Sequence, residues 1–168
     1  MDNALVDETV TLTQELIRIR SENPGGTEAG MADRTEDYLK NLGLDVERDD
    51  VVDGRQNIIA KLSANPDAPT LVYLNHMDTV PAGDGWTKDP FSAEISEGKL
   101  WGRGSCDMKG GLAASLIAIK NLKMKLDGGA RLNRSIRACL VVDEECSWMQ
   151  GVSKAVELGR IKKEDIVI

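Results

Sequence analysis

The chain has 168 residues, of which 41% are hydrophobic and 29% are charged, and its net charge is −7. This composition suits a globular domain with its own core, and an acidic chain without a basic stripe excludes nucleic acid and anionic membrane as expected partners. The three cysteines, Cys106, Cys139 and Cys146, form no C-x-x-C pair, and the N-terminus lacks a signal peptide pattern, so we expect a cytoplasmic location.

Helices and strands are predicted in alternation along the chain. Apolar residues at helical spacing predict helices at 2–20, 27–42, 108–126 and 149–158. Short apolar runs predict strands at 44–48, 57–62, 70–74, 135–142 and 165–168, and we expect a small hairpin around Glu97-Gly98. This alternation indicates an α/β fold with a layered, mostly parallel sheet and helices on both faces.

Potential metal ligands follow three of these segments. His76 and Asp78 come after the strand at 70–74, and Asp107 follows a glycine-rich turn. Glu144 and Glu145 follow the strand at 135–142. Ligands of open α/β sheets bind beyond the carboxyl ends of the strands, and imidazole with carboxylates is a ligand set for Zn²⁺ or a similar ion. Together, the three groups predict a metal site.

Each group taken alone has a plainer interpretation. An isolated H-x-D is more often a histidine near a turn, and an aspartate before a helix is more often an N-cap. A run of acids is usually a solvated loop. In the functional interpretation, Asp78 accepts the second ring N–H of His76. Two adjacent glutamates can also divide the work at a metal, one as a ligand and the other as a proton carrier.

Four motifs occur in order: HMDTVP (76–81), W-x-x-DPF (86–91), GRGSCDMKGG (102–111) and DEE (143–145). By these motifs and their spacing, the chain resembles the metal-dependent family of aminoacylases, acetylornithine deacetylases, succinyl-diaminopimelate desuccinylases and carboxypeptidase G. The resemblance covers essentially the whole chain and implies a zinc-peptidase-like catalytic domain. The motifs specify the family and leave the substrate open.

The resemblance implies a role for five motif residues. His76 and Glu145 would each ligate one of two divalent ions, with Asp107 as the bridge, and a cis peptide would follow Asp107. Asp78 would orient His76, and Glu144 would be the general base toward a water that bridges the ions. Zn²⁺ is the favoured ion, with Co²⁺ or Mn²⁺ as alternatives. The implied reaction is hydrolysis of a small N-acyl amino acid, of the deacetylase or desuccinylase type, and a dipeptidase or carboxypeptidase is the alternative.

The chain departs from the family pattern beyond Glu145. The resemblance implies an acid after the strand at 165–168, a distant histidine, and a lid domain that forms a homodimer, whereas His76 is the only histidine here. We therefore expect residues 1–168 to be a truncated, N-terminal portion of the catalytic domain, with negligible activity alone. The alternatives are a non-catalytic family member that binds metal weakly and an α/β domain with acidic loops and no chemistry.

Overall fold

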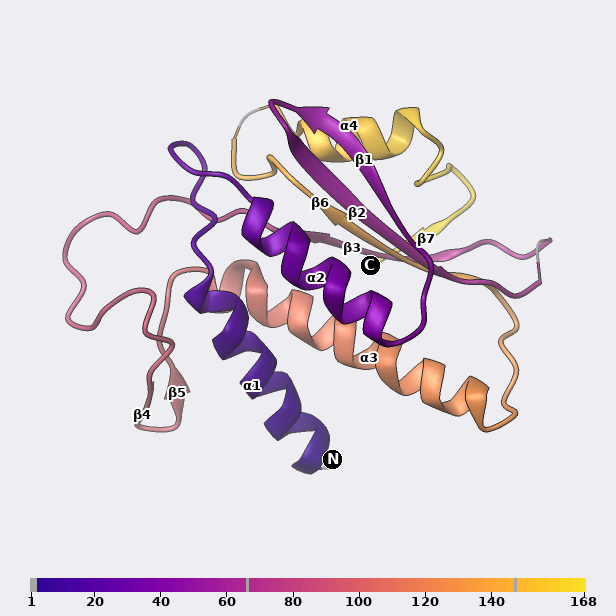
Figure 1. Ribbon diagram of the computed structural model, residues 1–168, viewed down its shortest axis with the longest axis horizontal. Helices are drawn as coiled ribbons and strands as arrows, with labels where there is room; N and C mark the ends of the chain where they lie inside the picture. The colour runs from indigo at the N-terminus through magenta and orange to yellow at the C-terminus, as the bar shows by residue number, and fades with distance from the viewer. Residues whose placement is uncertain (1–2, 66, 147) are drawn as a thin grey trace.

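The main sheet lies in the middle of the molecule, and its strands follow the order β1–β2–β6–β3–β7 (Figure 1). The computed structural model describes residues 3–65, 67–146 and 148–168. The strands are β1 (Val46–Val52), β2 (Arg55–Leu62), β3 (Leu71–His76), β6 (Ile136–Val141) and β7 (Ile166–Val167). Two further strands, β4 (Ile95–Ser96) and β5 (Lys99–Leu100), form a separate hairpin, which confirms the one expected around Glu97-Gly98.

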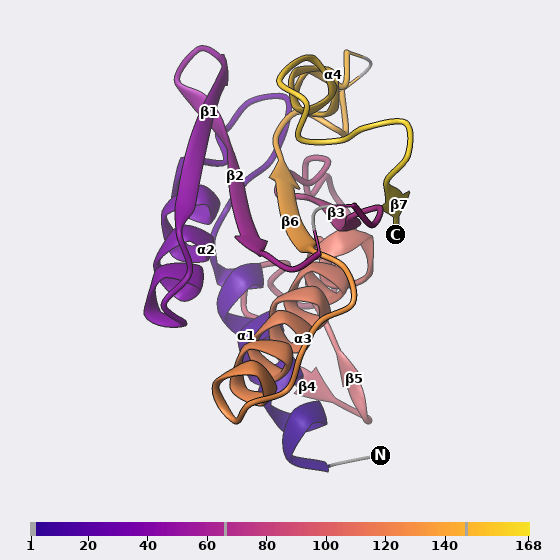
Figure 2. The ribbon, with the colours of Figure 1, turned by 90° about the vertical axis from the view of Figure 1, so that its right-hand side faces the viewer.

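Helices cover both faces of the main sheet. They are α1 (Asn3–Arg18), α2 (Ala29–Asn41), α3 (Gly110–Asp127) and α4 (Gln150–Glu157). Buried side chains of α1, α2 and α3 share one hydrophobic core with the sheet, and Ala155 of α4 packs on the opposite face (Figure 2). Along β6, Ala138 and Leu140 face the first core while Cys139 and Val141 face the second, because alternate residues of a strand point to opposite faces.

The predicted α/β class, with helices on both faces, is therefore confirmed. Among the residues that the structure describes, no helix has the length and apolar character to cross a membrane.

The sheet is evenly mixed, whereas the sequence predicted a mostly parallel one. β1 pairs with β2, and β2 with β6, in the antiparallel sense, while β3 runs parallel to both β6 and β7. The antiparallel pairing of β1 with β2 follows from the turn Asp53-Gly54, where φ is 47° and 74°. An Asp-Gly pair with positive φ closes a two-residue hairpin. The strands predicted at 44–48 and 57–62 therefore extend toward each other and form one antiparallel ribbon.

The carboxyl ends of β3 and β6 lie side by side, at the left of Figure 1. Parallel pairing sets His76, the last residue of β3, opposite Val141, the last residue of β6. α3 begins at Gly110 because residues 105–109 form an irregular turn, η1, in which Asp107 is extended with φ −119° and ψ 102°. The Asp107–Met108 peptide is cis, as the resemblance implied. These three segments bring the predicted ligands to one edge of the sheet.

Candidate metal centre

Three of the predicted ligands converge at this edge. His76, Asp107 and Glu145 each offer one ligand atom, and these atoms lie within 4.8 Å of one another. The closest contact joins His76 Nε2 to Asp107 Oδ1 at 2.9 Å. The carboxylate of Glu144, the predicted base, lies beside them, with Oε2 at 3.9 Å from His76 Nε2. One imidazole and three carboxylates therefore face a common point.

His76 is held mainly by a main-chain oxygen. Its Nδ1 lies 2.9 Å from the carbonyl oxygen of Asp78 and 3.4 Å from the Asp78 carboxylate. A carbonyl only accepts hydrogen bonds, so Nδ1 must carry a proton and donate it. The neutral ring then has its lone pair on Nε2, which is the nitrogen that faces Asp107. Asp78 thus contacts Nδ1, and its backbone oxygen lies closer to the ring than the carboxylate that the sequence predicted as the acceptor.

The charge around His76 favours a cation at this point. Burial lowers the pKa of His76, but hydrogen bonds to Asp78 and Asp107 and the charge of Glu144 outweigh it and raise the pKa to about 9. Burial also raises the pKa of Glu145, and the neighbouring acids raise it further against the opposing effect of His76. Carboxylates that repel one another are relieved by a bound cation, which would replace the proton on His76. The donor atoms present thus fit a divalent ion.

The side chains of this cluster differ in their exposure to solvent. The side chain of Asp107 is 76% exposed and that of Glu144 is 36% exposed, whereas His76 is only 6% exposed. The imidazole is therefore the buried member of the cluster, while the carboxylates of Asp107 and Glu144 are in contact with solvent.

The carboxylate of Asp78 is fully buried and anchors the acid loop, which we define as Asp143, Glu144 and Glu145. Asp78 Oδ1 accepts the amide N–H of Glu144 at 3.2 Å, and Oδ2 accepts that of Glu145 at 3.0 Å. Asn23 Nδ2 also donates to Oδ2, at 2.9 Å. Burial raises the pKa of Asp78, but these donors and His76 outweigh it and lower the pKa. One carboxylate thus ties the end of β3 to the loop after β6.

The first residue of the acid loop, Asp143, is held by a second set of buried hydrogen bonds. The Asp143 carboxylate accepts hydrogen bonds from Asn23 Nδ2 at 3.0 Å, Arg55 Nη1 at 3.2 Å and Gln150 Nε2 at 3.0 Å. The Asp143 amide donates to Glu28 Oε1 at 3.1 Å. Arg55 forms a fork on the same Glu28 carboxylate, with Nε at 2.6 Å from Oε2 and a second bond from Nη2.

Sequence reasoning missed these four partners of Asp143. The Asn-Pro pair at Asn23 and the Asp-Gly turn before Arg55 are readable turn signals, but they give no sign of a contact with the acid loop. Arg55 and Glu28 are 27 residues apart, and Arg55 and Asp143 are 88 apart. A single sequence cannot distinguish such pairs from separate surface charges.

The turn that carries Asp107 is fixed by close packing. Lys109 is only 1% exposed, and its Nζ donates to the carbonyl oxygens of Leu16 at 3.0 Å and Ile19 at 2.6 Å, at the end of α1. A cation there satisfies the last carbonyls of a helix, although burial lowers the pKa of Lys109 to about 8. Gly104 has φ 78°, and a Cβ there would lie 2.6 Å from Thr79 Cγ2. The turn thus packs against the end of β3.

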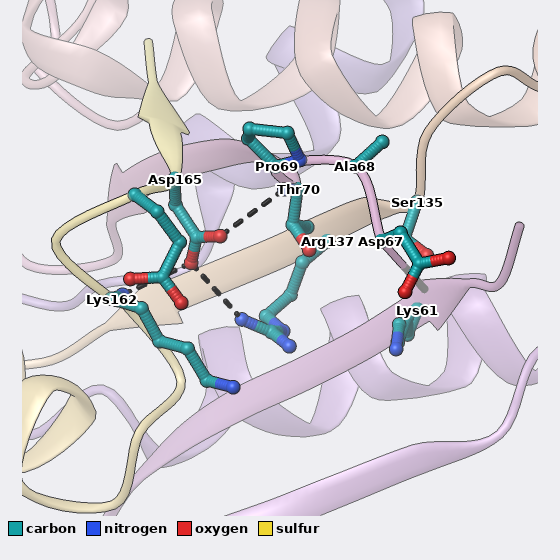
Figure 3. A pocket seen from close by; sticks show the side chains of 10 residues that line it. Lys61, Asp67, Ala68, Pro69, Thr70, Ser135, Arg137, Lys162 and Asp165 are labelled. Atoms are coloured by element: carbon teal, nitrogen blue, oxygen red, sulfur yellow. Dashed lines mark hydrogen bonds and ion pairs between the residues drawn. The ribbon is translucent and has the colours of Figure 1, made fainter. Parts of the chain in front are cut away.

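A hollow of about 420 Å³ lies at the opposite end of β3 (Figure 3). Its wall includes Thr70, which precedes β3, whereas His76 ends that strand. Asp165 also lines the hollow, and its carboxylate accepts hydrogen bonds from the amide N–H groups of Thr70 at 3.1 Å and Lys162 at 3.0 Å. The same carboxylate lies 3.6 Å from Arg137 Nη1. These bonds hold β7 beside β3. The hollow is therefore separate from the cluster of His76, Asp107 and Glu145.

Comparison with known proteins gives a consistent assignment. Residues 72–167, more than half of the chain, match the model for peptidase family M20/M25/M40. The chain is 34% identical to a succinyl-diaminopimelate desuccinylase of Methylobacterium radiotolerans over 168 residues, which is 97% of this chain and 41% of that relative.

Two solved structures share the fold. Human carnosine dipeptidase 1 is 26% identical with a TM-score of 0.72, over 82% of this chain and 32% of that one. An M20 family metallo-carboxypeptidase from Sulfolobus solfataricus is 29% identical with a TM-score of 0.68, over 80% of this chain and 30% of that one.

The fold and the strand-end motifs are those of a metallohydrolase-like α/β domain, and the chain belongs to peptidase family M20/M25/M40. The predicted family is thus confirmed. The chain spans less than half the length of the curated relatives that it matches.

Proposed function

We propose that this chain carries the divalent metal centre of an amide hydrolase, with His76, Asp107 and Glu145 as its ligands. The observation that supports this most directly is the convergence of their ligand atoms within 4.8 Å. Two ions would be held here, with Asp107 shared between them, His76 a ligand of one and Glu145 a ligand of the other. Zn²⁺ is the ion we favour because imidazole and carboxylate are its usual donors, and Co²⁺ and Mn²⁺ accept the same set.

In this proposal, the neighbouring side chains orient the ligands and move protons. The Asp78 backbone holds His76 in the tautomer that leaves Nε2 free, and the Asp78 carboxylate fixes the amides of Glu144 and Glu145. Glu144 takes a proton from the attacking water at its carboxylate and delivers it to the leaving amine. The ions, when bound, polarise the amide carbonyl and acidify water.

The substrate that we propose is a small N-acyl amino acid. Support comes from relatives named succinyl-diaminopimelate desuccinylase, which are 33% to 36% identical to this chain. A dipeptide or the C-terminal residue of a peptide is the second candidate, because the similar solved structures include a dipeptidase and a carboxypeptidase. The cytoplasmic location, the domain division and a homodimeric longer form stay predictions.

Metal titration of the 168-residue chain tests the site directly. Calorimetry with Zn²⁺ and with Co²⁺ would compare the unsubstituted chain with His76→Ala and Asp107→Asn. Asp37→Asn, a change at an exposed position of α2, is the matched control. We expect each ligand variant to weaken binding by about tenfold or more and the control to bind normally. Equal affinity in all four proteins would contradict the proposed ligand set.

Activity of the same chain tests the second part of the proposal. With Asp107 shared, each ion has two protein ligands from this chain, fewer than the three that catalytic zinc sites usually have. We therefore expect negligible hydrolysis of N-succinyl amino acids, N-acetyl amino acids and dipeptides by the purified chain. Robust turnover that a chelator abolishes and Zn²⁺ restores would show that expectation to be wrong.

A further inference from the structure

Arg55 lies at the start of β2, outside the candidate ligand set, yet it contacts the loop that carries two of the acids. Its guanidinium joins the carboxylates of Glu28 and Asp143, which belong to segments on either side of it. We propose that Arg55 is a positioning residue that holds the acid loop in the conformation able to bind a divalent ion. This inference rests on the proposed metal function and assigns a task to a side chain that touches no ligand atom.

The conformation of Asp143 shows what has to be held. Its φ is 61°, in the left-handed region that residues other than glycine rarely adopt. Such a conformation persists only where the surroundings impose it. Here Arg55, Asn23 and Gln150 all donate to the Asp143 side chain, and Glu28 accepts its amide. The contacts of Asp143 therefore determine the direction in which the chain leaves β6.

The direction of the loop decides where the next two residues point. Beyond Asp143, the amides of Glu144 and Glu145 both reach the buried carboxylate of Asp78. Asn23 Nδ2 contacts Asp78 and Asp143 together, at 2.9 and 3.0 Å, so the two anchors are joined. With its backbone fixed at both ends, the loop presents Glu145 to His76 and Asp107.

Positioning and simple electrostatics predict opposite effects of removing Arg55. Two buried carboxylates, from Glu28 and Asp143, contact the guanidinium, and Asn23 joins Asp143 to a third buried carboxylate, that of Asp78. Loss of that positive charge makes the region more negative, and charge alone would then strengthen cation binding. If Arg55 instead acts by geometry, its loss frees the acid loop and weakens cation binding. The sign of the change therefore distinguishes the two roles.

The ribbon of β1 and β2 offers a matched control for this test. Arg48 lies on β1 and pairs with Glu36 of α2, where its Nε, at 3.0 Å, and its Nη2 both donate to the same oxygen, Oε2. Arg48 thus joins β1 to α2, the helix that Glu28 precedes, but it has no described contact with the acid loop. Replacing Arg48 or Arg55 by methionine thus removes one guanidinium that is paired with a glutamate, and only Arg55→Met reaches Asp143.

The experiment measures Co²⁺ affinity by absorption titration and the exchange of the Glu144 and Glu145 amide protons by NMR, both in the 168-residue chain. We expect Arg55→Met to weaken Co²⁺ binding about tenfold or more and to increase the exchange rate of the Glu144 and Glu145 amide protons. Arg55→Lys should recover little, because one ammonium cannot form the fork. Arg48→Met should stay within about twofold of the unsubstituted chain in affinity, even if its melting temperature falls.

Tighter or unchanged Co²⁺ binding in Arg55→Met, with unchanged amide exchange, would overturn the inference. If Arg55→Met does not fold, Arg55→Lys carries the same comparison. If the unsubstituted chain binds no Co²⁺, the proposed metal function fails, and amide exchange still decides whether Arg55 positions the loop. Faster exchange in Arg55→Met but not in Arg48→Met supports positioning, and equal exchange in both rejects it.

Discussion

Replacement of Asp78 by asparagine tests whether this carboxylate anchors the acid loop. Asparagine keeps one oxygen and places an NH₂ group where the second oxygen was. If the oxygen keeps the bonds to Asn23 and Glu145, the N–H of Glu144 loses its acceptor and faces another donor. A buried donor without a partner costs about 1–3 kcal/mol, and each remaining bond loses the roughly 1 kcal/mol that ionisation adds. A neutral amide costs less free energy to bury than a carboxylate, which offsets part of this loss of stability.

We therefore expect Asp78→Asn to lower the free energy of unfolding by about 2–4 kcal/mol at pH 7. Urea denaturation followed by circular dichroism measures this, with Asp37→Asn as the exposed control, which should change stability by at most about 0.5 kcal/mol. Equal stability of the two variants would refute the anchoring role of Asp78.

The pH dependence of this difference provides an internal check. The pKa of Asp78 is lowered in the folded chain, because the hydrogen bonds that it accepts outweigh its burial. A lowered folded-state pKa contributes stability that is present above the unfolded-state value, about 3.9, and is lost as the pH falls below it. The gap between the unsubstituted chain and Asp78→Asn should therefore be widest near neutral pH and shrink in acid. A gap that is constant from pH 7 to pH 3 would contradict the lowered pKa.

Two further predictions concern packing and thiol access. A Cβ at Gly151 would lie 2.1 Å from the backbone oxygen of Val142, so Gly151→Ala must push α4 off β6. We expect a loss of about 1–3 kcal/mol in urea denaturation, and a neutral result would contradict the close contact. Cys106 is exposed, whereas Cys139 is buried and its pKa is raised to about 12 by burial. A thiol reagent should thus label Cys106 quickly, the half-buried Cys146 more slowly and Cys139 only after unfolding, and the fastest phase should disappear in Cys106→Ser.

The sequence predicted the gathering of the candidate ligand side chains because two of their segments follow a general rule. His76 ends β3 and Glu145 follows β6, and the carboxyl ends of these parallel strands meet at one edge of the sheet, where the turn before α3 adds Asp107. That rule needs only the order of the elements, and the family motifs then suggested a role for each residue. The spatial convergence of these three side chains agrees with that expectation.

The failures of sequence reasoning also have physical causes. Asp53-Gly54 was a readable hairpin signal, but the strand limits placed on either side hid it, and a mostly parallel sheet was expected as a result. Asp78 was assigned to His76 because of their spacing, while its longer-range bonds to the acid loop could not be read. Arg55 and Glu28 form a pair only in the folded chain, where the buried carboxylates of Glu28 and Asp143 contact one guanidinium.

The pairing of His76 with Val141 has a consequence for folding. A slip of one residue between β3 and β6 would move His76 by about 3.3 Å along the sheet and turn its side chain to the other face. The acid loop would then follow a strand that no longer ends beside the imidazole. The cluster can therefore form in one alignment of these strands only, and a metal probe added during refolding would report the moment at which the central strands reach their native register.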